Sequence, residues 1–302
     1  MKLGFIGLGK MGLAMAGRAV DHHHELVGYD VSEPALEAAK EKGIPTAASL
    51  EDLVAGLEKP RIIWMQLPPG VITNSTINKL EELVEPGDLL IDGGNSDFRD
   101  SVKNGNRLKE KGIGFCDIGV SGGVQGAREG AGMLIGSNDE VFERLKPLLE
   151  SLCAPGGYSH CGKLGAGHYA KAVHNGVEYA LMQAYAEGYE LLKNADIDMD
   201  VLATIEAYQN GCSIRSYILE KTVEALQPDP NLDGIKGFVA DSGMGRWIVE
   251  EATRLRIPTP TISMALQERF TSQQSDSPAM QCIAAMRGTI GGHPVKKAGE
   301  GK

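Results

Sequence analysis

The sequence predicts an α/β domain built on a parallel sheet, followed by an all-α domain. From Lys2 to about Cys161, short apolar runs alternate with segments that carry apolar residues at helical spacing, a pattern typical of βαβ units. After Gly165, long helical patterns follow one another without strand-like alternation. A length of 302 residues also suits two domains better than one. We therefore expect a first domain over residues 1–165 and a second over residues 166–302.

The apolar runs predict the strands of the first domain. They cover residues 3–6, 26–29, 62–67, 89–91 and 115–118. Between them, residues 11–20, 72–83 and 101–109 have the periodicity of amphipathic helices, which we expect to cover both faces of the sheet.

The second domain is predicted to be helical over residues 166–195 and 199–225. Residues 227–237 contain two prolines, an asparagine and two glycines, which favour a loop. The tail from Gly288 is expected to be extended or loosely structured.

Charge and cysteine usage limit the partners and the compartment. The formal net charge is −10 and the pI is about 5.3, which argues against binding to nucleic acid or to an anionic membrane. Five cysteines, none in a Cys-x-x-Cys pair, argue against a disulfide framework or structural zinc. No apolar stretch reaches the length of about 18 residues that a membrane span needs. We expect a cytoplasmic protein.

A glycine-rich motif joins the predicted first strand to the predicted first helix. The spacing G-x-G-x-x-G in this position is the Rossmann fingerprint for dinucleotides: the glycines allow a tight turn, a close approach of the pyrophosphate, and close packing of helix and strand. The predicted cofactor loop consists of Gly7, Leu8, Gly9, Lys10, Met11 and Gly12.

Asp30 ends the second apolar run, where an acidic side chain can accept hydrogen bonds from both adenosine ribose hydroxyls. It would repel a 2′-phosphate, and no lysine or arginine lies between Asp30 and Lys40 to neutralise one. The sequence therefore favours NAD, with NADP as the weaker alternative. The competing interpretation is a turn aspartate outside any site.

Glycine and proline clusters follow three later strands, at residues 66–70, 92–96 and 119–123. Any one of them could be an ordinary turn. The carboxyl ends of parallel strands meet at one edge of a sheet, so three clusters there favour a binding cleft. We expect Leu67, Pro68 and Asn95 to contact the cofactor.

The start of the second domain places polar side chains on one helix face. Lys171, His174, Asn175 and Glu178 lie at i, i+3, i+4 and i+7, and Tyr179 adjoins them. The alternative is a solvated helix face. Because the flanking residues are small and apolar, we expect a packed helix whose polar face has partners.

With these motifs in view, nearly the whole chain resembles the decarboxylating 6-phosphogluconate dehydrogenases, in their shorter NAD-type form. The resemblance rests on residues 7–12, 92–96, 119–123, 165–179, 245–247 and 287–293. It implies the oxidative decarboxylation of 6-phospho-D-gluconate to D-ribulose 5-phosphate and CO2 with reduction of NAD, and no metal. Lys171 is then the general base and Glu178 the general acid.

The resemblance also implies how the substrate is held. The sugar acid would contact Asn95, Ser121, Gly122, Gly123, His174 and Asn175, and the phosphate would contact Tyr179, Arg246, Arg269, Arg287 and His293. The family further implies that Arg287 and His293 complete the active site of a neighbouring subunit, so we expect a homo-oligomer, either a dimer or a dimer of dimers. Two features depart from the longer family members, namely the short helical domain and Asp30 in place of the polar-basic pattern of NADP users. Arg246 also stands where longer relatives commonly have a lysine, which keeps the charge.

Three alternatives remain open at this point. A β-hydroxyacid dehydrogenase of the 3-hydroxyisobutyrate type would share the glycine motif and the Lys/Asn helix but would need no phosphate site. A catalytically idle NAD-binding protein could use the same fold. Residues 21–25, which contain three histidines between two acidic residues, could bind a metal, but they fall where a solvated loop is expected.

Overall fold

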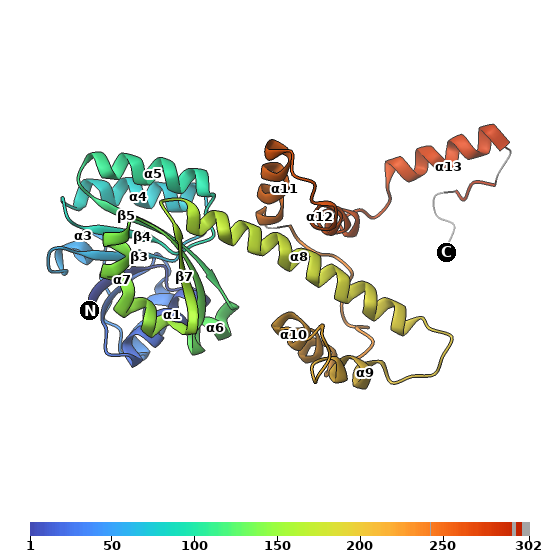
Figure 1. Cartoon of the computed structure of the whole chain (residues 1–302), viewed down its shortest axis with the longest axis horizontal. Coiled ribbons are helices and arrows are strands. Elements are labelled where there is room, and N and C mark those ends of the chain that lie inside the picture. Colours follow the sequence, from blue (N-terminus) through green and yellow to red (C-terminus); the bar gives the residue numbers. More distant parts are fainter. Residues whose placement is uncertain (242, 292–293, 298–302) are drawn as a thin grey trace. The chain divides into compact units, whose positions relative to one another are not determined.

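The computed structural model describes residues 1–241, 243–291 and 294–297, and it divides into two compact units, Met1–Asn175 and Gly176–Lys302. The division falls inside the long helix α8, Ala166–Lys193, whose first residue is the start of the predicted second domain. Each unit is described by itself below (Figure 1).

The first unit contains one seven-stranded sheet in the order β2-β1-β3-β4-β5-β6-β7. The five predicted strands are present, and their parallel pairing is confirmed. The sequence missed β6 and β7. Only the short helix α6 joins β5 to β6, too short a connection for a parallel crossover, and β6 accordingly runs antiparallel to β5. The strands are β1 (Lys2–Ile6), β2 (Glu25–Tyr29), β3 (Ile62–Met65), β4 (Leu89–Asp92), β5 (Gly114–Ser121), β6 (Ala131–Gly136) and β7 (Cys153–Gly162).

Helices cover both faces of this sheet, as the periodicity predicts (Figure 1). Successive strand residues point to opposite faces, so Trp64 packs in one core with Met15 and Leu145, whereas Met65 packs in the other with Ile77 and Leu108. The first core lies under α1 (Lys10–Asp21), α2 (Glu33–Glu41), α6 (Gly123–Glu129) and α7 (Asp139–Leu152), and the second under α3 (Leu50–Ala55), α4 (Val71–Leu83) and α5 (Phe98–Glu110).

The second unit is helical, which confirms the predicted all-α class. Its elements are the remainder of α8, α9 (Val201–Tyr208), α10 (Tyr217–Leu226), α11 (Met244–Leu255), α12 (Pro260–Ser272) and α13 (Pro278–Gly291). One apolar cluster joins α9 and α10 to Tyr185 and Tyr189 of α8, and another joins α11 and α12 to Tyr179 and Met182.

Two expectations for this unit are wrong. The predicted helix over residues 199–225 is interrupted between α9 and α10, where Gly211 adopts a φ of +83° that ends helical geometry. Gly288 to Gly291 belong to α13 and are not extended. Across the described ranges, no helix combines the length and the apolar character needed to cross a bilayer.

Candidate active site

The glycine motif forms a tight turn between β1 and α1. Gly7 has a φ of +93°, and a Cβ there would lie 2.3 Å from Gln66 O. A Cβ at Gly12 would lie 1.9 Å from Gly7 O, whereas one at Gly9 would meet nothing within 4 Å. Among the described side chains none caps the start of α1, so its first-turn N–H groups can bind an anion. The loop therefore fits the pyrophosphate of a dinucleotide.

Asp30 is fixed beside this loop, at the carboxyl end of β2. Its Oδ2 accepts a hydrogen bond from Leu8 N at 2.7 Å, and its Oδ1 accepts one from Ser32 N at 2.8 Å. Because a carboxylate oxygen has two lone pairs, each oxygen can still accept a hydrogen bond from a ribose hydroxyl. The arrangement fits the adenosine end of the same cofactor.

The turns after β3 and β4 lie against each other. A Cβ at Gly94 would be 2.7 Å from Leu67 O, so only glycine permits this approach. Leu67 is half-buried and Pro68 is exposed. Asn95 Oδ1 and Ser96 Oγ are buried and lack a hydrogen-bond partner among the described residues. Buried polar atoms of this kind are normally satisfied, so they point to a ligand or a water molecule at this turn.

The first turns of helix α8 pack against strand β5. Asp117, Gly119 and Ser121 alternate along β5 and therefore share one face. A Cβ at Gly119 would lie 2.3 Å from Lys171 Cβ, and Ser121 Oγ lies 3.1 Å from His174 Nε2. The next residues, Gly122 and Gly123, turn the chain into α6 with φ values of +108° and +61°. The structure thus brings the predicted Ser-Gly-Gly turn to the predicted polar face of α8.

Lys171 is buried, with 7% of its surface exposed. Its Nζ lies 3.3 Å from His174 Nδ1, which in turn lies 3.3 Å from Asn175 Oδ1. A general base must lie within hydrogen-bond reach of the proton that it accepts, and the position of the Lys171 amino group in this cluster is compatible with that role. His174 is exposed and Asn175 is buried, so the cluster reaches from the interior to the surface of the first unit.

Within the second unit, the predicted phosphate contacts Tyr179 and Arg269 lie against each other, and Arg246 lies on α11, which packs on Tyr179. The Tyr179 ring is 5% exposed and packs on α11, where a Cβ at Gly245 would lie 2.5 Å from it. The guanidinium carbon of Arg269 lies 3.4 Å from the centroid of the same ring. Arg246, next to Gly245, pairs through Nε with Asp241 Oδ2 at 2.8 Å. Glu178, which precedes Tyr179 on α8, is half-buried.

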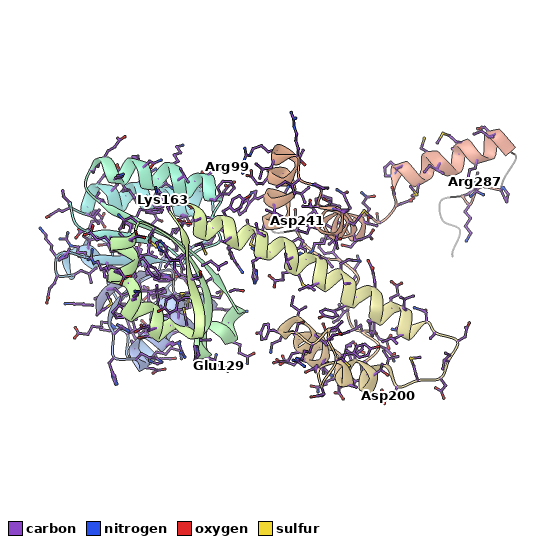
Figure 2. The ribbon with its side chains drawn as sticks, in the orientation of Figure 1. Arg99, Glu129, Lys163, Asp200, Asp241 and Arg287 are labelled. Atoms are coloured by element: carbon purple, nitrogen blue, oxygen red, sulfur yellow. The ribbon has the colours of Figure 1, made fainter. Side chains whose placement is uncertain are left out.

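Arg287, another predicted phosphate contact, lies on a different helix. Arg287 is exposed on α13, a helix with no buried residue (Figure 2). His293 lies outside the described residues. Their contribution to a neighbouring subunit therefore stays a prediction.

Sequence reasoning missed two carboxylates beside these residues. Asp117 sits in the apolar run 115–118, and Asp241 precedes the Gly-Arg-Trp motif that was recognised. Burial raises the pKa of the Asp117 carboxyl, although nearby His168 and the main-chain N–H groups of His168 and Gly165 oppose that shift. For Asp117, the available signal was a charged residue within an apolar run predicted to be a buried strand.

At residues 21–25, His24 is buried and uses both ring nitrogens within the protein. Its Nδ1 lies 3.0 Å from the Met1 amino group, and its Nε2 lies 2.9 Å from Ser151 Oγ. His22 and His23 are exposed. In the part of the chain that the structure describes, no group of three or more His, Cys, Asp or Glu residues is placed to hold a metal ion.

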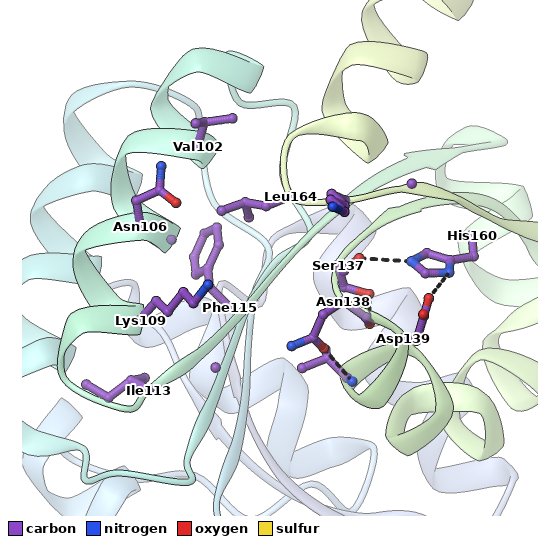
Figure 3. A pocket seen from close by; sticks show the side chains of 15 residues that line it. Val102, Asn106, Lys109, Ile113, Phe115, Ser137, Asn138, Asp139, His160 and Leu164 are labelled. Carbon is purple, nitrogen blue, oxygen red and sulfur yellow. Dashed lines mark hydrogen bonds and ion pairs between the residues drawn. The ribbon is translucent and has the colours of Figure 1, made fainter.

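A separate cavity of about 680 Å³ lies between α5 and the start of α7 (Figure 3). Asn106 and Lys109 line one side, and Asn138 and His160 line the other. It borders the amino end of β5 and contains none of the predicted site residues. The candidate site is therefore at the opposite, carboxyl edge of the parallel strands.

Comparisons with known proteins agree with this arrangement. The family model described as the NAD binding domain of 6-phosphogluconate dehydrogenase matches residues 2–167, and that of the C-terminal domain of 6-phosphogluconate dehydrogenase matches residues 167–292. The NAD(+)-dependent, decarboxylating 6-phosphogluconate dehydrogenase of Haloferax volcanii is 38% identical over 299 residues, which cover 98% of this chain and 99% of that protein. The Bacillus subtilis protein YqeC, provisionally named a 6-phosphogluconate dehydrogenase, is 38% identical over 297 residues and is covered completely.

A solved structure gives the same result at the level of the fold. The 6-phosphogluconate dehydrogenase of Plasmodium falciparum, studied with its cofactor NADP+ and with its substrate 6-phosphogluconate, superposes with a TM-score of 0.83 at 27% identity. The match covers 100% of this chain and 67% of that one. With family models matching most of its length, this chain belongs to the 6-phosphogluconate dehydrogenase family.

Proposed function

We propose that this chain converts 6-phospho-D-gluconate to D-ribulose 5-phosphate and CO2, and that it uses NAD in preference to NADP. The observation that supports this most directly is the buried Lys171, seated on Gly119 and 3.3 Å from His174 Nδ1 at the cofactor edge of the sheet. The NAD(+)-dependent relative from Haloferax volcanii supports the choice of reaction and of cofactor.

The dinucleotide would be held by the loop of residues 7–12 and by the neighbouring turns that contain Leu67, Pro68 and Asn95. The Asp30 carboxylate, fixed by Leu8 N and Ser32 N, would accept hydrogen bonds from the adenosine ribose hydroxyls and repel a 2′-phosphate. When bound, the nicotinamide supplies the acceptor for the hydride that leaves C3 of the substrate.

Lys171 accepts the proton of the C3 hydroxyl as that carbon is oxidised to a ketone. The protonated lysine then hydrogen-bonds the ketone oxygen. The bond from C2 to the carboxylate carbon breaks, CO2 leaves, and the electron pair forms the enediol. Glu178 donates a proton to the carbon that becomes C1 of ribulose 5-phosphate. Glu178 lies seven residues after Lys171 on α8, on the same helix face.

The remaining residues orient the substrate. Asn95, Ser121, Gly122 and Gly123 hold the carboxylate end, and His174 and Asn175 hold the hydroxyls. Tyr179, Arg246 and Arg269 bind the phosphate, for which charge-assisted hydrogen bonds from guanidinium groups are the strong ones. We also infer a homo-oligomer in which Arg287 and His293 of a neighbouring subunit complete this phosphate site.

The decisive experiment measures NADH or NADPH formation from 6-phosphogluconate, with CO2 collected, in parallel reactions with NAD and NADP. Equal amounts of reduced cofactor and CO2, with a higher kcat/KM for NAD, are expected. Reduction of NAD by 3-hydroxyisobutyrate without CO2, and none with 6-phosphogluconate, would contradict the proposal.

A variant separates the base from the cofactor site. Lys171→Met should abolish hydride transfer and leave the affinity for NAD, measured by fluorescence titration, at the wild-type level. Lys163→Met is the matched control, because Lys163 is an exposed lysine of the same unit and should be dispensable. A Lys171→Met enzyme that turns over at a normal rate would exclude this lysine as the base.

A further inference from the structure

Asp117 is a carboxylate at the centre of the sheet that the proposed reaction does not use. It lies on β5 and is completely buried. Its Oδ1 accepts a hydrogen bond from Gly165 N at 2.6 Å, and its Oδ2 accepts one from His168 N at 2.8 Å. Gly165 directly precedes α8 and His168 lies in its first turn, so a strand residue is bonded to the start of the helix that carries Lys171.

These bonds replace a capping box. In that motif the side chain of the N-cap residue accepts a bond from the N3 amide, and the N3 side chain accepts one from the N-cap amide. Gly165 precedes α8 and has no side chain, and His168 is the third helical residue. Asp117 accepts from both amides itself and thereby caps α8 from a strand 48 positions away in sequence.

Glycines bring the helix to its closest approach at this point. A Cβ at Gly136 would lie 2.4 Å from Asp117 Oδ1, and one at Gly167 would lie 2.4 Å from Asp117 O and 2.5 Å from Leu134 O. The first turn of α8 therefore rests directly on the backbone of β5 and β6. A second attachment comes from α5, where Ser101 Oγ lies 2.7 Å from His168 Nδ1.

We propose that Asp117 is a positioning residue. It fixes the distance between the first turn of α8 and strand β5, and so places Lys171 for proton transfer. Lys171 follows His168 by three residues, and its Cβ lies over Gly119, on the same face of β5 as Asp117. If the first turn of α8 moves away from β5, Lys171 moves with it. The inference rests on the proposed role of Lys171 as the base.

The test replaces the carboxylate and compares it with a second buried carboxylate of the same unit. Asp117→Asn keeps the shape but leaves one acceptor for two main-chain donors. Asp88→Asn is the matched control: Asp88 is also buried and also accepts from two main-chain N–H groups, Arg61 N at 2.7 Å and Glu85 N at 2.9 Å, but it lies before β4. Both variants are normalised to the concentration of NAD-binding sites.

The readouts distinguish positioning from mere stability. In Asp117→Asn we expect the normalised kcat to fall on the order of 10- to 100-fold, as misplacement of a catalytic group by about 1 Å does. The isotope effect with 6-phosphogluconate deuterated at C3 should rise, the KM for NAD should stay constant, and the amides of residues 166–169 should exchange hydrogen faster. In Asp88→Asn the normalised kcat and the isotope effect should stay at wild-type values.

Three outcomes would overturn the inference: an unchanged normalised kcat in Asp117→Asn, an unchanged isotope effect, or a loss of rate without faster exchange in the first turn of α8. If Asp117→Asn does not fold, Ser101→Ala decides, because it removes the second attachment of the same turn and should produce a smaller fall with the same rise in isotope effect. A fully active Lys171→Met enzyme would refute the proposed base by itself, whichever result Asp117→Asn gives.

Discussion

Gly119→Ala places a methyl group where α8 rests on β5, and its effect can be derived from the structure. The new Cβ would lie 2.3 Å from Lys171 Cβ, 2.9 Å from Lys171 Cγ and 3.1 Å from Gly167 O. Carbon atoms in ordinary contact are about 3.5–4.0 Å apart, so the helix must move by roughly 1 Å or more. The contact is to a Cβ and to backbone, which cannot swing aside as the tip of a long side chain would.

A displacement of about 1 Å at a catalytic group can lower the rate by about 100-fold. That loss corresponds to about 2.7 kcal/mol of transition-state stabilisation. We therefore expect kcat with 6-phosphogluconate to fall on the order of 100-fold, while the affinity for NAD, whose loop is formed by other residues, stays constant. Steady-state kinetics and fluorescence titration measure the two quantities.

Gly114→Ala is the control for this variant, since it lies on the same strand. Its Cβ would meet Leu89 Cδ1 at 3.1 Å, a movable side-chain atom, and kcat should change little. A Gly119→Ala enzyme that keeps kcat within about twofold of wild type, a change worth only about 0.4 kcal/mol, would refute the reasoning, because Lys171 would then tolerate displacement.

Three further predictions concern the cofactor, the phosphate and the stability. Asp30→Asn should lower the ratio of kcat/KM for NAD to that for NADP by about 10- to 100-fold, since hydrogen bonds to a charged group contribute about 1.5–3 kcal/mol; an unchanged ratio would exclude Asp30 as the ribose ligand. Arg246→Gln should raise the KM for 6-phosphogluconate by about 10-fold or more at constant KM for NAD, by loss of a charge-assisted bond to phosphate; Arg256→Gln, an exposed residue at the end of the same helix, should have no such effect. Although burial opposes it, the N–H groups of Glu85 and Arg61 and the Arg61 guanidinium lower the pKa of Asp88 from 3.8. Its contribution to the free energy of unfolding is therefore present above that pH and lost as the pH falls below it. Thermal melts of Asp88→Asn should accordingly depend less on pH below about 4 than those of wild type; parallel curves would contradict this.

The sequence was sufficient to predict five strands because a parallel sheet is buried on both faces. Residues 62–65 and 89–92, for example, are buried without exception. Residues 62–65 and 89–91 are apolar runs followed by turns rich in glycine or proline. The missed strand β7, Cys153–Gly162, is an edge strand with mostly exposed or half-buried residues, including Ser159 and His160. An edge strand does not need an apolar sequence, so periodicity could not reveal it.

The site was predictable where its residues follow a local rule. The loop of residues 7–12 and the turns after the strands stand out because glycine is required there, and Gly7 and Gly122 do adopt positive φ values. Asp117 follows no such rule, because its partners, Gly165 N and His168 N, are main-chain groups far away in sequence. Asp241 pairs with Arg246 and lies close to it in sequence. An acidic residue near a predicted phosphate-binding arginine was therefore a signal that the sequence contained.

The face of β5 that carries Asp117, Gly119 and Ser121 permits a test of coupling. Asp117→Asn and Gly119→Ala would both act by displacing α8. If one substitution has already displaced the helix, the second should add a smaller further displacement. Contacting residues of this kind couple by about 0.5–3 kcal/mol, whereas distant sites add. The double variant should therefore lose less activity than the product of the two single losses, and Asp117→Asn combined with Asp30→Asn should lose the full product in kcat/KM for NAD. Independent effects of Asp117→Asn and Gly119→Ala would mean that the two residues influence Lys171 by different routes, and that the position of the helix is not the quantity they share.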